Sequence, residues 1–142
     1  AFGRAGGGYR LILANRTLIP RLDDPVAADL LEDNALAIAG GRLKLTLSWF
    51  EEFGSWNRSD TTFTFRYIRG RFELAAFDRA TSARGSGNVT GLSVDYLART
   101  VIATSGNVDR DWVSTQRRSP PRGPAPTLEE IGEGLTFSPM LP

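Results

Sequence analysis

Apolar and polar side chains alternate with a period of two along most of this chain, a pattern typical of half-buried β-strands. The clearest case is the segment 35–49, where two alternating runs flank Gly40-Gly41. Paired glycines supply the positive φ angles that a two-residue hairpin turn requires. We therefore predict a β-hairpin whose second strand buries one row of side chains and exposes the other. The predicted buried row is Leu43, Leu45, Leu47 and Trp49.

The same logic predicts a second hairpin, which turns at Arg69-Gly70. Its first strand places Phe63 and Phe65 on one face, opposite the threonines between them. On the return strand, strict alternation places Phe77 on the face opposite to Leu74. Further alternating strands are predicted at residues 89–96, 100–104 and 112–116, and two shorter ones at 9–14 and 17–19.

These elements predict a mainly β fold: one antiparallel hairpin meander, either an open sandwich or a partly closed barrel, with one or two short helical turns. A flexible glycine-rich N-terminus over residues 1–8 precedes the β domain at 9–116. Residues 117–126 hold four prolines and must be extended rather than part of a sheet. Residues 127–142 are predicted to form a short helical turn and a tail that docks on the sheet through Leu135, Phe137, Met140 and Leu141. A second short helix is predicted at 26–31.

Composition excludes several classes of chemistry. The 142 residues include no cysteine and no histidine, which excludes disulfides, thiolate nucleophiles, the Ser-His-Asp triad and the usual zinc sites. The formal net charge of +1 gives no long-range attraction to nucleic acid. In the segment 63–67 the aromatic rings alternate away from Arg66, which favours a core strand over a base-stacking platform. We predict no nucleic-acid partner and, because the apolar runs are short, no transmembrane segment.

Several motifs follow one another in a familiar order. They are Leu-Ser-Trp-Phe at 47–50, Gly-Ser-Trp at 54–56, the segment Phe-Thr-Phe-Arg-Tyr-Ile-Arg-Gly-Arg-Phe-Glu-Leu at 63–74 and Thr-Ser-Gly-Asn-Val-Asp at 104–109. Across residues 34–137 the chain resembles the β-rich C-terminal domain of exported, uncharacterised bacterial proteins. Where that family usually has Ile-Gly-Tyr, this chain has Ala75-Ala76-Phe77. The resemblance implies a β fold and a periplasmic or secreted location, and it implies no activity or catalytic residue.

The segment 49–60 is unusually rich in aromatic residues and is predicted to be a loop between the two hairpins. Exposed aromatic rings beside amide and carboxylate groups suit stacking on sugar rings with hydrogen bonds to hydroxyls. The alternative is that these rings close one end of the core. The predicted contact residues are Glu52, Phe53, Trp56, Asn57 and Asp60.

A metal site is considered at Asn107, Asp109 and Asp111, where oxygen ligands recur at every second position as in a calcium loop. The glycine and glutamate of such a loop are replaced by Trp112 and Arg118. Ordinary turn residues explain the same pattern, because Asn and Asp bond their own backbone. We therefore predict no cofactor, with calcium as the alternative.

The available carboxylates suggest no catalytic pair. The candidates are Glu51, Glu52, Asp60, Asp78 and Asp95. Adjacent residues on a strand point to opposite faces, so Glu51 and Glu52 cannot form the pair that glycoside hydrolysis requires. No catalytic residue is assigned.

The sequence therefore predicts a non-catalytic binding or structural module of an exported bacterial protein, with an unidentified protein or glycan as partner. The alternative is a carboxylate-dependent hydrolase or a lectin-like domain that acts on a glycan of the cell envelope.

Overall fold

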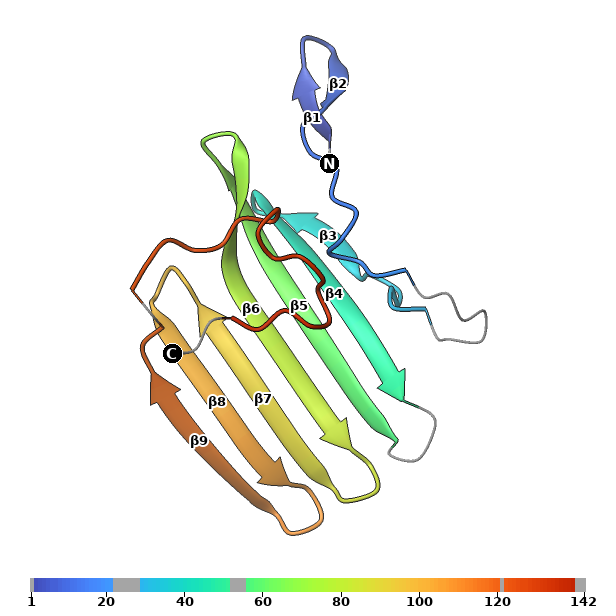
Figure 1. Ribbon diagram of the computed structural model, residues 1–142, viewed down its shortest axis with the longest axis vertical. Coiled ribbons are helices and arrows are strands. Elements are labelled where there is room, and N and C mark those ends of the chain that lie inside the picture. Colours follow the sequence, from blue (N-terminus) through green and yellow to red (C-terminus); the bar gives the residue numbers. More distant parts are fainter. Residues whose placement is uncertain (1, 22–28, 52–55, 121, 140–142) are drawn as a thin grey trace.

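A computed structural model describes residues 2–21, 29–51, 56–120 and 122–139 (Figure 1). Seven strands form one antiparallel sheet in the order of the chain. They are β3 (Leu36–Ala39), β4 (Arg42–Glu51), β5 (Asn57–Ile68), β6 (Arg71–Ala83), β7 (Asn88–Asp95), β8 (Thr100–Asn107) and β9 (Trp112–Arg118). Each strand pairs only with its sequence neighbours, and β3 and β9 do not meet, so the sheet is open. The predicted mainly β meander is confirmed.

The N-terminal residues form a separate hairpin of β1 (Phe2–Ala5) and β2 (Gly8–Leu11). The sequence predicts a flexible segment over residues 1–8, whereas the structure pairs them from Phe2 onward. The chain turns at Gly6 and Gly7, whose φ angles are 52° and 88°. Glycine adopts such positive φ angles without strain, so these two residues can form the turn.

The described residues form no helix, and so none that could cross a membrane. The helix predicted at 26–31 falls partly on residues 22–28, outside the described part, and Asp29–Leu31 are not helical. Residues 127–130 form a single hydrogen-bonded turn, in which the Glu130 N–H donates to the Thr127 carbonyl at 3.0 Å.

One face of the sheet, here called the tail-side face, carries the core. The C-terminal tail, residues 119–139, crosses this face over part of β4 to β7 and leaves the ends of the strands near the β4–β5, β6–β7 and β8–β9 turns uncovered (Figure 1). Leu18 from the N-terminal segment, and Leu128 and Ile131 from the tail, are buried against the sheet. The buried strand residues are Leu45, Leu47, Phe63, Phe65, Phe72, Leu74, Phe77, Val94 and Val101.

A β-bulge in β6 changes which side chains reach this core. Thr64 pairs with Ala76, but Phe65 pairs with Leu74, so Ala75 is the extra residue. One extra residue reverses the alternation beyond it. Phe77 therefore lies on the same face as Leu74, fully buried, and the prediction that strict alternation places it on the opposite face is wrong.

The tail is held to the sheet by backbone hydrogen bonds. The Leu74 N–H donates to the Pro126 carbonyl and the Leu128 N–H donates to the Phe72 carbonyl, both at 2.9 Å. The Gly134 N–H donates to the Leu18 carbonyl, also at 2.9 Å. A Cβ at Gly134 would lie 2.7 Å from Leu47 Cδ1, so only glycine allows this close approach without a shift.

The turn at the start of the tail predicts a pH effect. The Glu130 carboxylate accepts hydrogen bonds from the Thr127 backbone N–H at 2.7 Å and hydroxyl at 2.9 Å. These bonds favour the ionised form and lower the pKa of Glu130 below its ordinary value. The resulting stabilisation is present above the unfolded pKa and is lost as the pH falls through the folded pKa. NMR titration should show a lower Glu130 pKa in the folded than in the urea-unfolded chain, and Thr127→Ala should reduce the difference. Equal values in both states would contradict this.

Candidate functional site

Five hydroxyl side chains form one row across the uncovered part of the tail-side face, which we call the hydroxyl row. Each comes from a different strand, and each is the direct register partner of the next. On β4 the register partner of Ser59 is Trp49, so an indole begins the row. The hydroxyl row is Ser59, Thr81, Thr90, Ser105 and Ser114.

The row lies on the tail-side face because side chains two or four positions apart on a strand share a face. Ser59 lies four residues before Phe63, and Thr81 lies four residues after Phe77. Both phenylalanines are fully buried in the core. Thr90 and Ser105 stand in the same relation to Val94 and Val101, which are also buried.

The hydroxyls become more exposed from β5 to β9. Ser59 and Thr81 are half-buried, and the Thr81 hydroxyl donates to Ser59 Oγ at 3.3 Å. Thr90, Ser105 and Ser114 are exposed. The row is therefore open to solvent over three adjacent strands.

A second set of residues lies one step further from the tail, and we call it the outer row: Asn57, Ala83, Asn88, Asn107 and Trp112. Asn107 is buried, and its amide donates to the Asn88 Oδ1 at 2.8 Å and to the Ser86 carbonyl at 2.7 Å. The indole of Trp112 is 45% exposed at the β9 edge. Amide groups and an aromatic ring thus border the hydroxyls.

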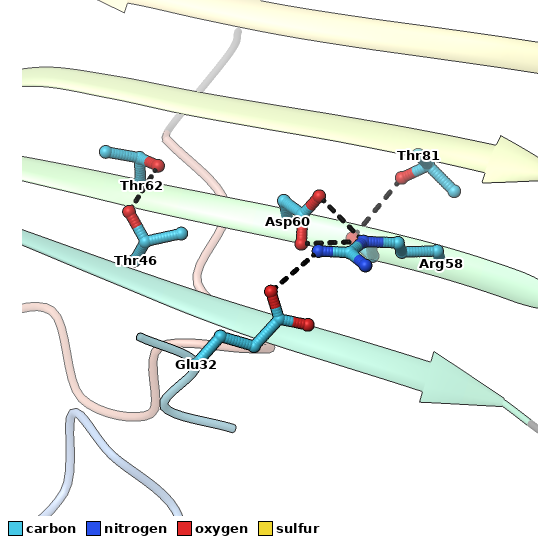
Figure 2. Close-up of polar contacts among 7 residues, drawn as sticks. Glu32, Thr46, Arg58, Asp60, Thr62 and Thr81 are labelled. Carbon is cyan, nitrogen blue, oxygen red and sulfur yellow. Dashed lines mark hydrogen bonds and ion pairs between the residues drawn. The ribbon is translucent and has the colours of Figure 1, made fainter. Parts of the chain in front are cut away.

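The ten positions of the two rows carry no charged side chain. The opposite face of the sheet is different, as Figure 2 shows. There Arg58 pairs with Asp60 at 3.0 Å and with Glu32 at 2.9 Å, and these contacts raise the pKa of Arg58, with the Asp60 hydrogen bond as the largest cause. The lack of charged side chains at these ten positions therefore distinguishes the two rows from the opposite face of the sheet.

A shallow pocket of about 470 Å³ lies at the Trp49 end of the hydroxyl row. The N-terminal segment and the tail form its walls, and Trp49, Ser59 and Thr61 belong to the sheet. The other lining residues are Pro20, Arg21, Glu133, Leu135 and Thr136. The row is thus bounded by other parts of the chain at β4, while its far end at β9 is the edge of the sheet.

The structure separates the contact residues that the sequence predicts. Trp56 is 56% exposed and contacts the Phe50 ring edge-on, with ring centroids 6.3 Å apart. Asn57 belongs to the outer row, whereas Asp60 lies on the opposite face in its ion pair with Arg58. Glu52 and Phe53 lie outside the described residues. The predicted loop is also shorter than residues 49–60, because β4 continues to Glu51 and β5 begins at Asn57.

The residues considered as calcium ligands form the turn between β8 and β9. Asn107 Oδ1 accepts the Arg110 N–H at 3.0 Å, and the Asp109 carboxylate packs over Gly87. Asp111 has a φ angle of 49°, a turn conformation. Within the described ranges, no three His, Cys, Asp or Glu side chains come together in a way that could hold a metal ion.

The three candidate carboxylates whose side chains the structure describes do not face one another across a pocket. Asp60 is paired with Arg58, and Asp78 is exposed on the same opposite face. Asp95 Oδ1 accepts the backbone N–H groups of Leu97 and Ala98, both at 2.8 Å, in the β7–β8 turn. Glu51 and Glu52 have no described side chain.

A second pocket, of about 450 Å³, lies between the proline-rich part of the tail and strands β7 and β8. Its lining includes Val94, Val101 and Tyr96, and burial raises the pKa of Tyr96. Pro139 also lines it, and the predicted docking residues Met140 and Leu141 follow directly, outside the described residues. We assign this pocket no ligand.

No direct signal in the sequence points to the hydroxyl row, because its members are separated by 9 to 22 residues and are common surface residue types. Comparison with other proteins adds no site: no protein family matches this chain, and no curated protein or solved structure is significantly similar to it.

Proposed function

We propose that this chain is a non-catalytic binding module of an exported bacterial protein, and that it binds a neutral glycan through the hydroxyl row and the outer row. One observation carries the proposal: from β5 to β9 the hydroxyl row and the outer row carry hydroxyl and amide groups and no charged side chain, with Trp49 beside Ser59 on β4 and Trp112 on β9.

The chemistry of these groups matches that of sugars. Hydroxyl and amide side chains can both donate and accept hydrogen bonds, as sugar hydroxyls do. The indole of Trp49 or Trp112 offers an apolar face on which a sugar ring can stack. A neutral surface gives no advantage to anionic ligands, so neutral sugars fit best. The proposed exported location rests on the resemblance to exported bacterial domains.

A protein partner fits these rows less well. The centre of a protein interface is usually rich in large apolar and aromatic side chains, whereas here the centre is Thr90 and Ser105. Hydrolysis is also less favoured. Of the described candidate carboxylates, Asp60 is paired with Arg58, Asp95 accepts backbone hydrogen bonds in a turn, and Asp78 lies on the opposite face.

The proposal predicts that a charge placed in the hydroxyl row prevents binding. Thr90→Glu introduces a charge that a bound neutral sugar would desolvate, and we expect binding to weaken about tenfold or more. The matched control is Ala80→Glu, because Ala80 is also exposed in the middle of the sheet but lies on the opposite face. Affinity electrophoresis in gels that contain soluble β-glucan, xylan, galactomannan or dextran measures the effect.

We expect at least one polysaccharide to retard the wild type and Ala80→Glu, but not Thr90→Glu. Equal retardation of both variants would contradict the proposed surface. Trp56→Ala tests the aromatic segment that the sequence analysis singled out. If Trp56→Ala loses retardation while Thr90→Glu keeps it, the glycan binds at Trp56 and Phe50 rather than at the hydroxyl row. Migration unaffected by every polysaccharide would refute glycan binding.

A further inference from the structure

We infer that the ligand is an extended, equatorially linked polysaccharide that lies across the strands, with one sugar over each strand from β5 to β9 and the ring over Ser59 also against Trp49. This inference rests on the proposed function and names the shape and orientation of the ligand.

The first argument is the straightness of the hydroxyl row. Its members are direct register partners from β5 to β9, and the only register shift between β5 and β6 lies at Thr64/Phe65, outside the row. The row therefore runs across the strands without a step. Neighbouring strands are about 4.8 Å apart, so the five hydroxyls span roughly 19 Å.

The second argument is the repeat along this row. One hydroxyl recurs per strand, and this spacing of about 4.8 Å is close to the length of one sugar ring in an extended chain. Successive sugars of such a chain can thus meet equivalent groups on successive strands. A coiled glucan with axial linkages curves away from a flat row and can meet only one or two of them.

The third argument is the difference between the two ends. At β4 the row meets the pocket formed by Trp49, Pro20 and the tail residue Leu135, which together can hold a ring. At β9 no described strand continues the sheet, and Ser114 and Trp112 are exposed. A long chain can therefore begin or pass at Trp49 and leave over β9 without obstruction.

The tail gives the row a side wall. The tail crosses the tail-side face (Figure 1). Its residues Leu135 and Thr136 line the same pocket as Trp49 and Ser59. The outer row with Asn88 borders the other side. An extended ligand that lies between these two borders therefore runs along the row, across the strands, and not parallel to them.

Isothermal titration of the full chain with oligosaccharides of defined length tests this inference. The probes are cello-, manno- and xylo-oligosaccharides of two to six sugars, with malto-oligosaccharides of the same lengths as the coiled control. We expect the affinity for one extended series to rise with each sugar up to about five, the number of hydroxyls in the row, and then to level off.

The variant Ser105→Glu locates the far part of the ligand. Ser105 is on the fourth strand of the row, so we expect about tenfold weaker binding of the five-sugar ligand and an unchanged affinity for the two-sugar ligand. The matched control is Thr115→Glu, because Thr115 is exposed on β9 but faces the opposite side, and it should bind both ligands as the wild type does.

The outcomes separate the inference from the proposed function. An affinity independent of length, or equal binding of malto-oligosaccharides, would overturn the extended ligand while leaving a glycan-binding surface. The length series on the wild type decides this even where Ser105→Glu fails to fold. If neither the oligosaccharides nor the polysaccharides bind, both proposals fail.

Discussion

We expect Phe77→Ala to lower the free energy of unfolding by about 3–5 kcal/mol, the usual cost of removing a buried phenylalanine side chain. Phe77 is fully buried, and its ring meets both Phe63 and Phe137 edge-on with centroids 5.4 Å apart. Loss of this ring removes contacts to the sheet and to the tail together. Urea unfolding followed by tryptophan fluorescence measures the change.

Ile38→Ala is the matched control, because Ile38 is 80% exposed on the edge strand β3. The expected loss there is less than about 1 kcal/mol. The comparison tests the bulge at Ala75 directly. If Phe77→Ala costs no more than Ile38→Ala, Phe77 lies on the solvated face, as strict alternation predicts, and the bulge is absent.

A second large effect is expected at Arg79, which fastens the tail to the sheet. Its Nη2 donates to the carbonyl oxygens of Leu135 at 3.0 Å and Phe137 at 2.9 Å. Its Nε donates to Thr61 Oγ1 at 3.1 Å. Burial lowers the pKa of Arg79, but a guanidinium stays charged at neutral pH.

Arg79→Met keeps most of the apolar stem but leaves the tail carbonyls without their donor. We expect a loss of about 2–4 kcal/mol in the free energy of unfolding, because hydrogen bonds from a charged group are worth more than neutral ones. Limited proteolysis should cut the variant within residues 122–139 faster than the wild type. Arg110→Met is the control, since Arg110 is exposed in the β8–β9 turn.

Arg79→Lys should recover part of the loss, because an ammonium group can serve one or two of these carbonyls but lacks the fork of donors. Unchanged stability and unchanged protease sensitivity in Arg79→Met would show that the tail does not depend on this residue. The tail also forms one wall of the pocket at Trp49. Its release should therefore weaken glycan affinity at the Trp49 end as well.

The candidate site was less predictable than the fold. The segment 49–60 is predicted to be a loop, whereas β4 continues to Glu51 and β5 begins at Asn57. Asn57 and Asp60 are three positions apart on β5, which places them on opposite faces. A loop would have let them converge, whereas a strand cannot.

The alternation of side chains by itself determined the hairpin strands, the buried faces of β4 and β5 and the turns at Gly40-Gly41 and Arg69-Gly70, because these depend on contacts between near neighbours in sequence. It could not locate the bulge at Ala75, since Leu74-Ala75-Ala76-Phe77 fits either alternation. Only the tertiary structure decided which half of the tail-side face the tail covers. It also decided the hydroxyl row, because a row across strands depends on the register between them, and that register follows from turn geometry and core packing rather than from any one strand.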